Sequence, residues 1–322
     1  MPKRDIIVVG ASTGGIASLQ ELVSALPADL PAAMLIVLHL GANAPGMLPE
    51  ILGRAGPLPA QVPEDKAAIE AGRIYVAPPD RHLLVERGRV RVVRGPKENR
   101  HRPAIDPLFR SAAWAYGPRV IGVVLSGELD DGTAGLWAIK TCGGIAVVQD
   151  PHGAISQGMP RNALAHTEID HCVPLVEIAP LLVRLADEEV DGAVRAPETL
   201  KSEVDFASMK GDIRDMDALG TLSPYTCPTC RGALWELTDA DLLRYRCHTG
   251  HAFSAESLVA EQSTAVEDAL YSALRVVEEK ATALRRIDET MPATAHQVTQ
   301  HRITDLDATA KILRGLLAGD RS

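Results

Sequence analysis

The chain of 322 residues is 46% apolar but only 3% aromatic, which predicts one large domain with an aliphatic core and a smaller second part. Its formal net charge of −9 argues against a nucleic-acid partner, because the phosphate backbone needs a basic surface. The N-terminus lacks the apolar core of a signal peptide and no apolar run is long enough to span a bilayer, so the sequence predicts a cytoplasmic protein without membrane insertion.

Strand and helix patterns alternate through residues 1–185, the first expected domain. Short apolar runs typical of strands buried on both faces occur at residues 6–10, 34–38, 120–125 and 145–149. Shorter strands are expected at residues 72–78 and, around the Arg87-Gly88 turn, within residues 83–93. One stripe of a helix is formed by Leu19, Leu22, Val23 and Leu26. Residues 135–141 predict a second helix. This alternation is typical of an α/β fold in which a doubly wound, mostly parallel sheet carries helices on both faces.

Three further regions are expected after residue 185. Residues 186–223 are rich in acidic side chains and have no apolar periodicity, which predicts a linker that is at least partly disordered when isolated. Residues 224–253 hold three of the five cysteines and are expected to form a compact Cys/His module. Residues 254–322 carry apolar side chains at three- and four-residue steps, which predicts a helical C-terminal region.

Capping signals mark the start of the helical region. Ser254 can accept a hydrogen bond from a backbone N–H of the first turn, and Phe253 and Leu258 are placed as a hydrophobic staple. Pro292 is expected to end this helix, and a second helix is expected at residues 294–317. The two helices are a candidate surface for a protein partner.

A glycine-rich turn, Gly10-Ala-Ser-Thr-Gly-Gly15, follows the first predicted strand. A serine at such a turn is exposed at the carboxyl edge of the sheet, where backbone N–H groups and a helix N-terminus stabilise negative charge on the group that it attacks. The same kind of turn is more often a phosphate or dinucleotide site, although Ser12 and Thr13 stand where a dinucleotide fingerprint needs its second glycine. On these residues alone, a nucleotide-binding domain is slightly favoured.

Two further side chains favour an esterase. His39 ends the second strand and Asp131 follows the strand at residues 120–125, so both belong to the same carboxyl edge as Ser12. A serine nucleophile needs a base that removes its proton, and the base needs a carboxylate that fixes its tautomer. Each residue also has an ordinary structural interpretation: a buried histidine bonded to a carbonyl, and for Asp130 and Asp131 a turn or a helix cap.

Several short motifs follow one another along the first domain. They are Gly10-Ala-Ser-Thr-Gly-Gly15, Ile36-Val-Leu-His39, Ala77-Pro-Pro-Asp-Arg-His82, Arg100-His-Arg-Pro-Ala-Ile-Asp106, Leu125-Ser-Gly127, Asp131-Gly132 and Gly158-Met-Pro-Arg161. Their order resembles that of the CheB-type protein-glutamate methylesterases of chemotaxis, over about residues 5–185. The resemblance implies a serine esterase that hydrolyses glutamyl methyl esters on a receptor-like protein and releases methanol, with glutamine deamidation as a candidate second reaction. It assigns Ser12 as nucleophile, His39 as base and Asp131 as the orienting carboxylate, with Asp130 the weaker candidate.

Two features differ from the usual form of this family. That form carries an N-terminal receiver domain that restrains the esterase until it is phosphorylated, whereas this chain starts at the esterase part, so the switch is expected to be absent. The loop before Asp131 reads Gly127-Glu128-Leu129, where chemotaxis members usually read Gly-Met-Gly. The backbone N–H of residue 128, together with that of Thr13, is expected to bind the oxyanion. The Glu128 carboxylate is expected to change the field there, and with it the substrate.

The five cysteines are odd in number and three of them cluster, which favours a metal site over a disulfide framework. Two close pairs of ligands have the spacing of a structural zinc site: Cys227, Cys230, Cys247 and His251. His251 is favoured over His248 because adjacent side chains point apart, whereas Gly250 lets the chain return towards Cys247. Since four protein ligands leave no position open for a substrate, the zinc is expected to be structural, and the esterase is expected to stay active without it.

The other cysteines, histidines and arginines have less specific interpretations. Core positions are expected for Cys142 and Cys172. Surface or packing positions are expected for His101, His152, His166 and His171. Candidates to line the catalytic cleft and meet an acidic substrate are Arg81, His82, Arg100 and Arg102, although a solvated charged face is nearly as good an interpretation. Two other functions remain open: a non-catalytic docking protein that uses the Cys/His module and the helical tail, and a nucleotide-binding domain.

Overall fold

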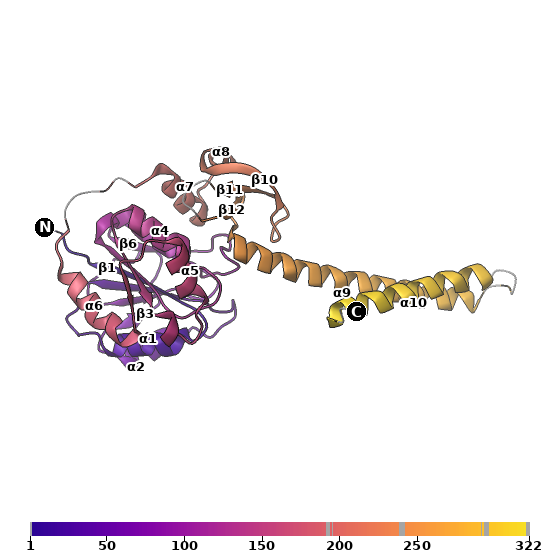
Figure 1. The fold of residues 1–322 in the computed structure, drawn as a ribbon, viewed down its shortest axis with the longest axis horizontal. Coiled ribbons are helices and arrows are strands. Elements are labelled where there is room, and N and C mark those ends of the chain that lie inside the picture. The colour runs from indigo at the N-terminus through magenta and orange to yellow at the C-terminus, as the bar shows by residue number, and fades with distance from the viewer. Residues whose placement is uncertain are drawn as a thin grey trace. The chain divides into compact units, whose positions relative to one another are not determined.

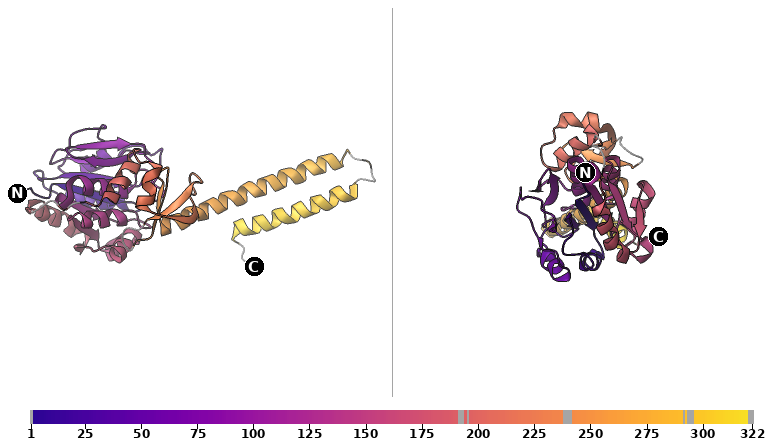
Figure 2. Two further views of the ribbon diagram at one scale, coloured as in Figure 1. Left: turned by 90° about the horizontal axis from the view of Figure 1, so that it is seen from above. Right: turned by 90° about the vertical axis from the view of Figure 1, so that its left-hand side faces the viewer.

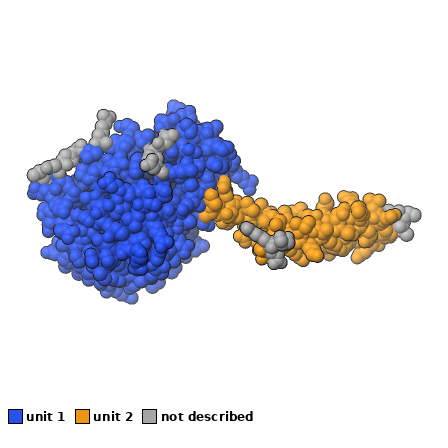
Figure 3. All heavy atoms as spheres, viewed as in Figure 1, with its two compact units in different colours: residues 1–258 blue, residues 259–322 orange. Residues whose placement is uncertain are grey.

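The computed structural model describes residues 2–190, 194, 196–237, 242–290, 292 and 296–319. The chain divides into two compact units, residues 1–258 and residues 259–322 (Figure 3). Among the described residues, none of the helices combines the length and the apolar character that crossing a membrane requires.

A seven-stranded sheet forms the centre of the first unit (Figure 1). Its strands, in spatial order, are β3 (Ala60–Gln61), β4 (Ile74–Val76), β2 (Ala33–Leu38), β1 (Ile6–Ala11), β7 (Val120–Val124), β8 (Ile145–Gln149) and β9 (His171–Val173). Every neighbouring pair is parallel. The chain winds outwards in both directions from β1 and β7, so the doubly wound α/β fold expected from the sequence is confirmed.

Successive residues of the central strands face two separate cores, because side chains alternate along a strand. Val8 of β1 belongs to one core and Val9 to the other. The helices that contribute to the first core are α3 (Ile105–Tyr116), α4 (Thr133–Thr141) and α5 (Gly158–His166). Those that contribute to the second are α1 (Gly15–Ser24), α2 (Leu48–Ala55) and α6 (Leu175–Asp187). The predicted stripe from Leu19 to Leu26 is buried in the second core.

An antiparallel hairpin of β5 (His82–Glu86) and β6 (Arg89–Val93) lies outside the main sheet. Its turn contains Gly88 at φ 77°, a left-handed conformation that glycine adopts without steric cost. The N–H of Val85 donates to Oγ of Ser111 on α3 over 2.9 Å, which fixes the hairpin against that helix. The following residues, 94–104, lead to the start of α3 and carry several side chains of the site described below.

The Cys/His module is a four-stranded antiparallel sheet. Its strands are β10 (Gly220–Thr226), β11 (Ala233–Leu237), β12 (Arg244–Cys247) and β13 (Ala252–Ser254). The first strand begins at Gly220, a few residues before the expected start of the module. The module belongs to the same compact unit as the seven-stranded sheet.

Part of the range expected to be a linker, residues 186–223, is regular structure. It contains α7 (Glu198–Ala207) and α8 (Met216–Leu219). Leu200 is buried in the core beneath α3, and Phe206 packs with Met216 and Leu219. These apolar side chains are too few and too widely spaced to give a periodic pattern, which is why the sequence did not predict the helices. Short 3₁₀ helices lie at Gly117–Arg119, Pro151–Gly153 and Ile213–Asp215.

Two long helices, α9 (Ala255–Asp288) and α10 (His296–Ala318), make up most of the C-terminal region and run antiparallel to each other (Figure 2). Ion pairs join them, from Arg285 to Asp307 and from Arg314 to Glu278, both at 2.6 Å. The cap of α9 is the predicted one, because the Ser257 N–H donates to Oγ of Ser254 over 3.0 Å. The expected start of the second helix, at residue 294, lies outside the described residues.

Candidate functional site

Ser12 lies in the turn between β1 and α1. Its N–H donates to the Ser126 carbonyl over 2.9 Å, and its carbonyl accepts from the Gly15 N–H over 2.8 Å. Gly14 has φ 78°, and a Cβ added there would lie 2.6 Å from Ile155, so the turn requires glycine. Ser12 is therefore held at the carboxyl end of β1, beside the point where the strand order reverses, which is the usual position of sites in open α/β sheets.

His39 follows β2 and lies between Ser12 and Asp131. Its N–H donates to the Ala11 carbonyl over 3.1 Å, which continues the pairing of β2 with β1. Its ring places Nδ1 3.1 Å from Oγ of Ser12 and Nε2 2.7 Å from Oδ2 of Asp131. With the proton on Nε2, the imidazole donates to the carboxylate and accepts from the hydroxyl. The three predicted side chains thus form one hydrogen-bonded series.

The Asp131 side chain is buried and accepts hydrogen bonds through both oxygens. Besides His39, Oδ2 accepts from the Ile105 N–H at 2.7 Å, while Oδ1 accepts from the Asp106 N–H at 3.1 Å and from Nδ2 of Asn99 at 3.0 Å. Ile105 and Asp106 begin α3, so the positive end of that helix faces the carboxylate. Burial acts to raise the pKa of Asp131, but hydrogen bonding to His39, the charge of that ring and the Ile105 and Asn99 donors outweigh it and lower the pKa below its ordinary value.

Asp130, the weaker carboxylate candidate, has a different partner. Its Oδ1 accepts a hydrogen bond of 2.7 Å from Oγ of Ser254. Burial raises the pKa of Asp130 to about 6, although the hydrogen bond from Ser254 acts in the opposite direction. The carboxylate that contacts His39 is therefore Asp131.

A second buried carboxylate, Asp106, lies beside Asp131. It accepts from the N–H groups of Gly132 at 3.0 Å and Gly135 at 2.7 Å, at the start of α4. Nδ2 of Asn99 bridges the two carboxylates, 2.9 Å from Asp106 and 3.0 Å from Asp131. Burial, and then the charge of Asp131, raise the pKa of Asp106 to about 7. Of this pair, Asp131 is the carboxylate that remains ionised near neutral pH.

The ring of His101 stacks on the ring of His39, with centroids 3.6 Å apart and planes inclined by 10°. Burial, and then the neighbouring His39, lower the pKa of His101 to about 4. His101 is therefore neutral near pH 7 and adds no positive charge beside His39. Its packing contact helps to fix the plane of the His39 ring.

A cleft of about 400 Å³ opens beside Ser12 and His39. The other residues that line it are Leu40, Gly41, Ala42, Asp80, Lys97, Arg100, His101 and Arg102. Cations dominate this lining, since its carboxylate, Asp80, pairs with Arg102 at 2.6 Å while Lys97 and Arg100 add further positive charge. The cleft is thus suited to an acidic substrate.

Within the part of the chain that the structure describes, the remaining cleft candidates, Arg81 and His82, do not line the cleft, and one of the two remaining cysteines is not in the core. Arg81 is exposed and is not among the described residues that line the cleft. His82 is buried, and its Nε2 donates to the Pro96 carbonyl over 2.8 Å, so it has a structural position. Cys142 is buried as expected, but Cys172 is exposed because β9 is the edge strand of the sheet.

The loop after β7 approaches Ser12 closely. A Cβ added to Gly127 would lie 2.0 Å from Sδ of Met159 and 2.9 Å from Cβ of Ser12, so a larger residue would not fit. Oγ of Ser126 donates to the Thr13 carbonyl over 2.7 Å. These contacts hold the backbone of this loop against the turn that carries the serine.

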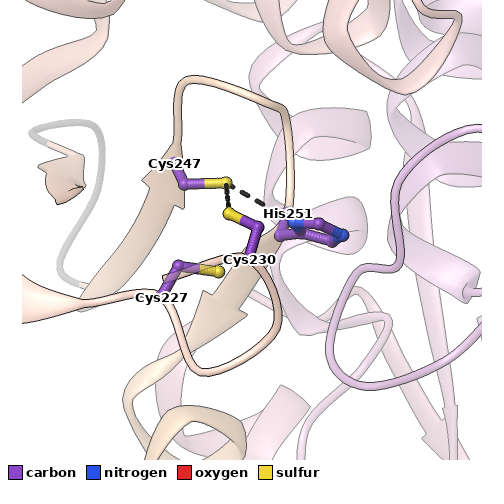
Figure 4. A group of neighbouring side chains, drawn as sticks. All are labelled: Cys227, Cys230, Cys247 and His251. Atoms are coloured by element: carbon purple, nitrogen blue, oxygen red, sulfur yellow. Dashed lines mark hydrogen bonds between the residues drawn. The ribbon is translucent and has the colours of Figure 1, made fainter. Parts of the chain in front are cut away.

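The four residues expected to bind zinc, Cys227, Cys230, Cys247 and His251, converge in the Cys/His module (Figure 4). Their ligand atoms all lie within 4.8 Å of one another, and the group among the described residues does not include His248. Sγ of Cys247 is 3.6 Å from Sγ of Cys230 and 3.6 Å from Nδ1 of His251. A tetrahedral ion with bonds of about 2.3 Å to sulfur separates two sulfurs by about 3.8 Å, so the cluster fits a metal ion.

The sequence did not single out Asn99 as a site residue. Its side chain bonds to Asp106, Asp131 and Ser254, which are 7, 32 and 155 residues away. Local patterns contain no information on such distant partners. Asp106 lies within one of the quoted motifs, and that motif was the available signal for its position.

Comparison with known proteins identifies the family of the first domain. Residues 7–182 match the family model described as CheB methylesterase. A putative protein-glutamate methylesterase/protein-glutamine glutaminase of Leptospira interrogans is 38% identical over 188 residues, which are 58% of this chain and 97% of that protein. Protein-glutamate methylesterase/protein-glutamine glutaminase 4 of Anaeromyxobacter dehalogenans is 35% identical over 187 residues, which are 57% of this chain and 52% of that longer protein.

A solved structure also matches. The crystal structure of the Thermotoga maritima CheB methylesterase catalytic domain superposes with a TM-score of 0.54 and 31% identity, over 56% of this chain and 98% of that one. The Cys/His module and the C-terminal helices lie outside the residues 7–182 that the family model matches. Because those residues are more than half of the chain and contain the serine, histidine and aspartate described above, the chain belongs to the CheB methylesterase family, a family of carboxylic ester hydrolases.

Proposed function

We propose that the chain hydrolyses glutamyl methyl esters on a methylated protein, such as a receptor, with Ser12 as nucleophile, His39 as base and Asp131 as the orienting carboxylate. The observation that carries this proposal is the hydrogen-bonded series of these side chains, with contacts of 3.1 and 2.7 Å. It supplies the nucleophile, the base and the orienting carboxylate that a serine esterase requires. The printed names of the relatives describe the same chemistry, protein-glutamate methylesterase and protein-glutamine glutaminase.

In the first half-reaction, Oγ of Ser12 attacks the ester carbonyl carbon while Nδ1 of His39 takes the hydroxyl proton. The resulting imidazolium keeps its Nε2–H hydrogen bond to Asp131, and the negative charge of that carboxylate stabilises it. His39 then gives the proton to the methoxide oxygen as the ester C–O bond breaks. Methanol leaves, and the glutamyl acyl group stays on Ser12.

The intermediate between these steps carries negative charge on the former carbonyl oxygen. The backbone N–H groups of Thr13 and Glu128 are the donors that we assign to this oxygen. They belong to the two loops that meet at Ser12 through the contact of Ser126 with Thr13. The N-terminus of α1 follows the same turn and adds positive partial charge.

Water completes the reaction. His39 removes a proton from a water molecule that attacks the acyl carbon, and then returns it to Oγ of Ser12, which frees a glutamate side chain. A glutamine side chain could enter the same steps, with ammonia leaving in place of methanol. The protein product therefore carries one more negative charge than the protein substrate, with the proton released to water or taken up by ammonia, and this is consistent with a cleft that contains Lys97 and Arg100.

The Cys/His module is assigned to one structural zinc ion. Three cysteine sulfurs and one imidazole nitrogen are a common tetrahedral ligand set for zinc. With all four positions filled by protein, the ion would have no site for water or substrate, so its contribution is to folding. Among its described residues, the module has a small core of six buried side chains, which is little for a sheet of this size without a metal.

Covalent trapping tests the esterase. A fluorophosphonate should label the full chain at Ser12, and peptide mass spectrometry should locate the label there, with none in Ser12→Ala. Release of methanol from a methylated receptor fragment tests the substrate class. A non-catalytic docking protein would give neither label nor methanol. A dinucleotide-binding domain would give neither, and would bind a labelled dinucleotide in titration.

A further inference from the structure

Strand β12 of the Cys/His module has two chemically different faces. Its side chains alternate as Arg244, Tyr245, Arg246 and Cys247. Tyr245 and Cys247 are buried in the core of the module. Arg244 and Arg246 face the other way, and both are buried, with 5% and 0% exposure. The strand therefore carries a metal ligand on one face and two buried cations on the other.

These cations pair with carboxylates outside the module. Arg246 bonds to Glu98 at 3.1 Å and to Glu203 of α7 at 2.8 Å, and Arg244 bonds to Glu203 at 2.8 Å. Arg110 of α3 also pairs with Glu98. Buried charges need their partners, because an unpaired ion in the interior is costly. The cluster therefore ties the module to the segment that contains Glu98.

The loop between the metal ligands Cys247 and His251 joins this contact. The Gly250 carbonyl, inside that loop, accepts from Nη1 of Arg246 at 2.9 Å. The residue after the histidine ligand, Ala252, accepts from the Asn99 N–H at 2.8 Å. The same residue forms a β-bridge with Glu98. The backbone next to a metal ligand is thus paired with the backbone of the cleft segment at residues 97–102.

The contact continues to the catalytic carboxylate. The Ser254 N–H donates to Oδ1 of Asn99 at 3.0 Å, and Oγ of Ser257 donates to the same oxygen at 3.2 Å. On its other side, the Asn99 amide donates to Asp131 at 3.0 Å. Oγ of Ser254 also donates to Asp130, the neighbour of Asp131, at 2.7 Å. One amide side chain therefore links the end of the module to the group that orients His39.

We propose that the Cys/His module is a positioning clamp for the active site, in which the bound metal holds β13, and β13 holds Asn99 and hence Asp131. Asn99 and Ser254 are the positioning residues of this clamp. The proposal rests on the esterase and zinc assignments made above. It reverses the expectation from sequence that the esterase stays active without metal, because Asn99, which donates to the catalytic carboxylate, and Asp130, the neighbour of that carboxylate, both accept hydrogen bonds from Ser254, which follows a metal ligand.

The clamp is tested by removing zinc from the full chain with a chelator and then restoring it. Hydrogen exchange reports the geometry without any activity, since the N–H groups of Asn99, Ile105 and Asp106 all donate within this network. Removal of zinc should speed exchange at these amides by about tenfold or more, while β1 stays protected. The rate of fluorophosphonate labelling at Ser12 should fall by about tenfold or more, since small displacements of catalytic groups cost rate. Both changes should reverse when zinc is added.

Unchanged labelling after β12 and β13 have lost protection would overturn the clamp. If zinc-loaded protein is never labelled, the esterase assignment fails, but the exchange comparison still decides whether the module holds Asn99. Loss of protection in β1 would mean that chelation unfolds the whole unit. In that case the Ser254 variants described next test the clamp, because they leave the metal ligands in place.

Ser254→Ala removes the hydroxyl that donates to Asp130 and caps α9, whereas Ser254→Thr keeps a hydroxyl. We expect kcat to fall several-fold in Ser254→Ala with KM changed less, and to recover largely in Ser254→Thr. The matched control is Ser263→Ala on α9, whose hydroxyl donates to the Val259 carbonyl and to no residue of the site. Equal kcat in Ser254→Ala, Ser254→Thr and Ser263→Ala would contradict the proposal.

Discussion

Asn99 and Ser254 are joined by a hydrogen bond of 3.0 Å across 155 residues of sequence. The Asn99 amide uses its oxygen for this contact and its nitrogen for the carboxylates of Asp106 and Asp131. Both ends of the amide are therefore fixed, and neither can turn without loss of a buried hydrogen bond. Through this side chain, the C-terminal part of the first unit contributes to the surroundings of His39.

The catalytic assignment predicts the effects of single substitutions. Ser12→Ala and His39→Ala should each lower kcat/KM for a methylated glutamyl peptide by about 10³-fold or more, because the nucleophile and its base act as a unit. Asp131→Asn should be more damaging than Asp130→Asn, since Asp131 bonds to His39 and Asp130 bonds to Ser254. Equal and mild losses at 130 and 131 would show that the orienting carboxylate lies elsewhere.

Substitution of Asn99 should affect rate and pH dependence differently according to the charge introduced. Asn99→Ala removes a donor to Asp131 and should lower kcat by about tenfold. Asn99→Asp places a third carboxyl group beside Asp106 and Asp131, and like charges raise the pKa of one another. We therefore expect Asn99→Asp to lose more kcat/KM than Asn99→Ala at pH 8, and to lose less than Asn99→Ala at pH 6. Measurement of kcat/KM across pH checks this. Identical pH profiles for Asn99→Asp and the wild type would contradict this role.

The buried Asp130 carboxyl should make the first unit less stable as pH rises. Its pKa is raised to about 6 in the folded protein, chiefly by burial, against about 4 in an unfolded chain. Between these values the folded state holds more protons, so stability falls as pH rises from about 4 to about 6 and stays low above it. Asp130→Asn should therefore raise the free energy of unfolding by about 1–3 kcal/mol at pH 8 and by little near pH 4.

Denaturant unfolding at the two pH values checks this prediction. The exposed Asp268 of α9 offers a control, since Asp268→Asn should change the free energy of unfolding by the same small amount at both pH values. A stability difference between Asp130→Asn and the wild type that does not change with pH would mean that the carboxyl titrates as in an unfolded chain.

Metal analysis should distinguish the two candidate histidines. The wild type is expected to contain one zinc per chain, as is His248→Ala, whereas His251→Ala should lose most of it, because only His251 is grouped with the three cysteines among the described residues. Elemental analysis after exhaustive dialysis measures this directly. Loss of zinc in His248→Ala alone would reverse the assignment.

The buried ion cluster should be worth far more than a surface pair. Arg246→Met leaves Glu98 and Glu203 short of a partner in the interior and should destabilise the first unit by about 3–5 kcal/mol. Arg275→Met removes an exposed pair with Glu279 on α9 and should cost less than about 1 kcal/mol. Denaturant unfolding measures the free energy of unfolding of both variants. Similar small losses would mean that the ion cluster is not the main contact between the module and the rest of the first unit.

The sheet and the edge that carries Ser12, His39 and Asp131 could be predicted from sequence for one physical reason. Strands buried on both faces are continuous apolar runs, and the carboxyl ends of parallel strands share one edge. The preference for Asp131 over Asp130 came instead from the resemblance to the methylesterases. The cluster of three cysteines and His251 could be predicted because the spacing within each of its two pairs is local. By contrast, α3 was not predicted. This helix is buried on nearly all sides and carries Asp106 and Arg110 inside, so it has no polar face to give a periodic pattern.

The burial of the arginines of β12 could not be predicted from sequence. A segment that reads Arg-Tyr-Arg-Cys resembles a strand with one solvated face, yet Arg246 has no exposed surface. Its burial depends on Glu98 and Glu203, which are distant in sequence and carry no pattern that relates them to β12. The position of Asn99 was hidden for the same reason.

The alternation in β12 also limits how this module could be exchanged between proteins. A graft that copied only the cysteine and histidine spacing would bind its ion, but it would present no guanidinium groups to the acceptor and would remain a detached appendage. Insertion or deletion of a single residue in β12 would be worse, since it would turn Cys247 towards the carboxylates and an arginine into the metal core. A working chimaera needs Arg244, Arg246 and Ser254 in the module, and Glu98, Asn99 and Glu203 in the protein that receives it. What has to be transferred is therefore the whole interface between the module and the rest of the first unit, and not the ion site alone.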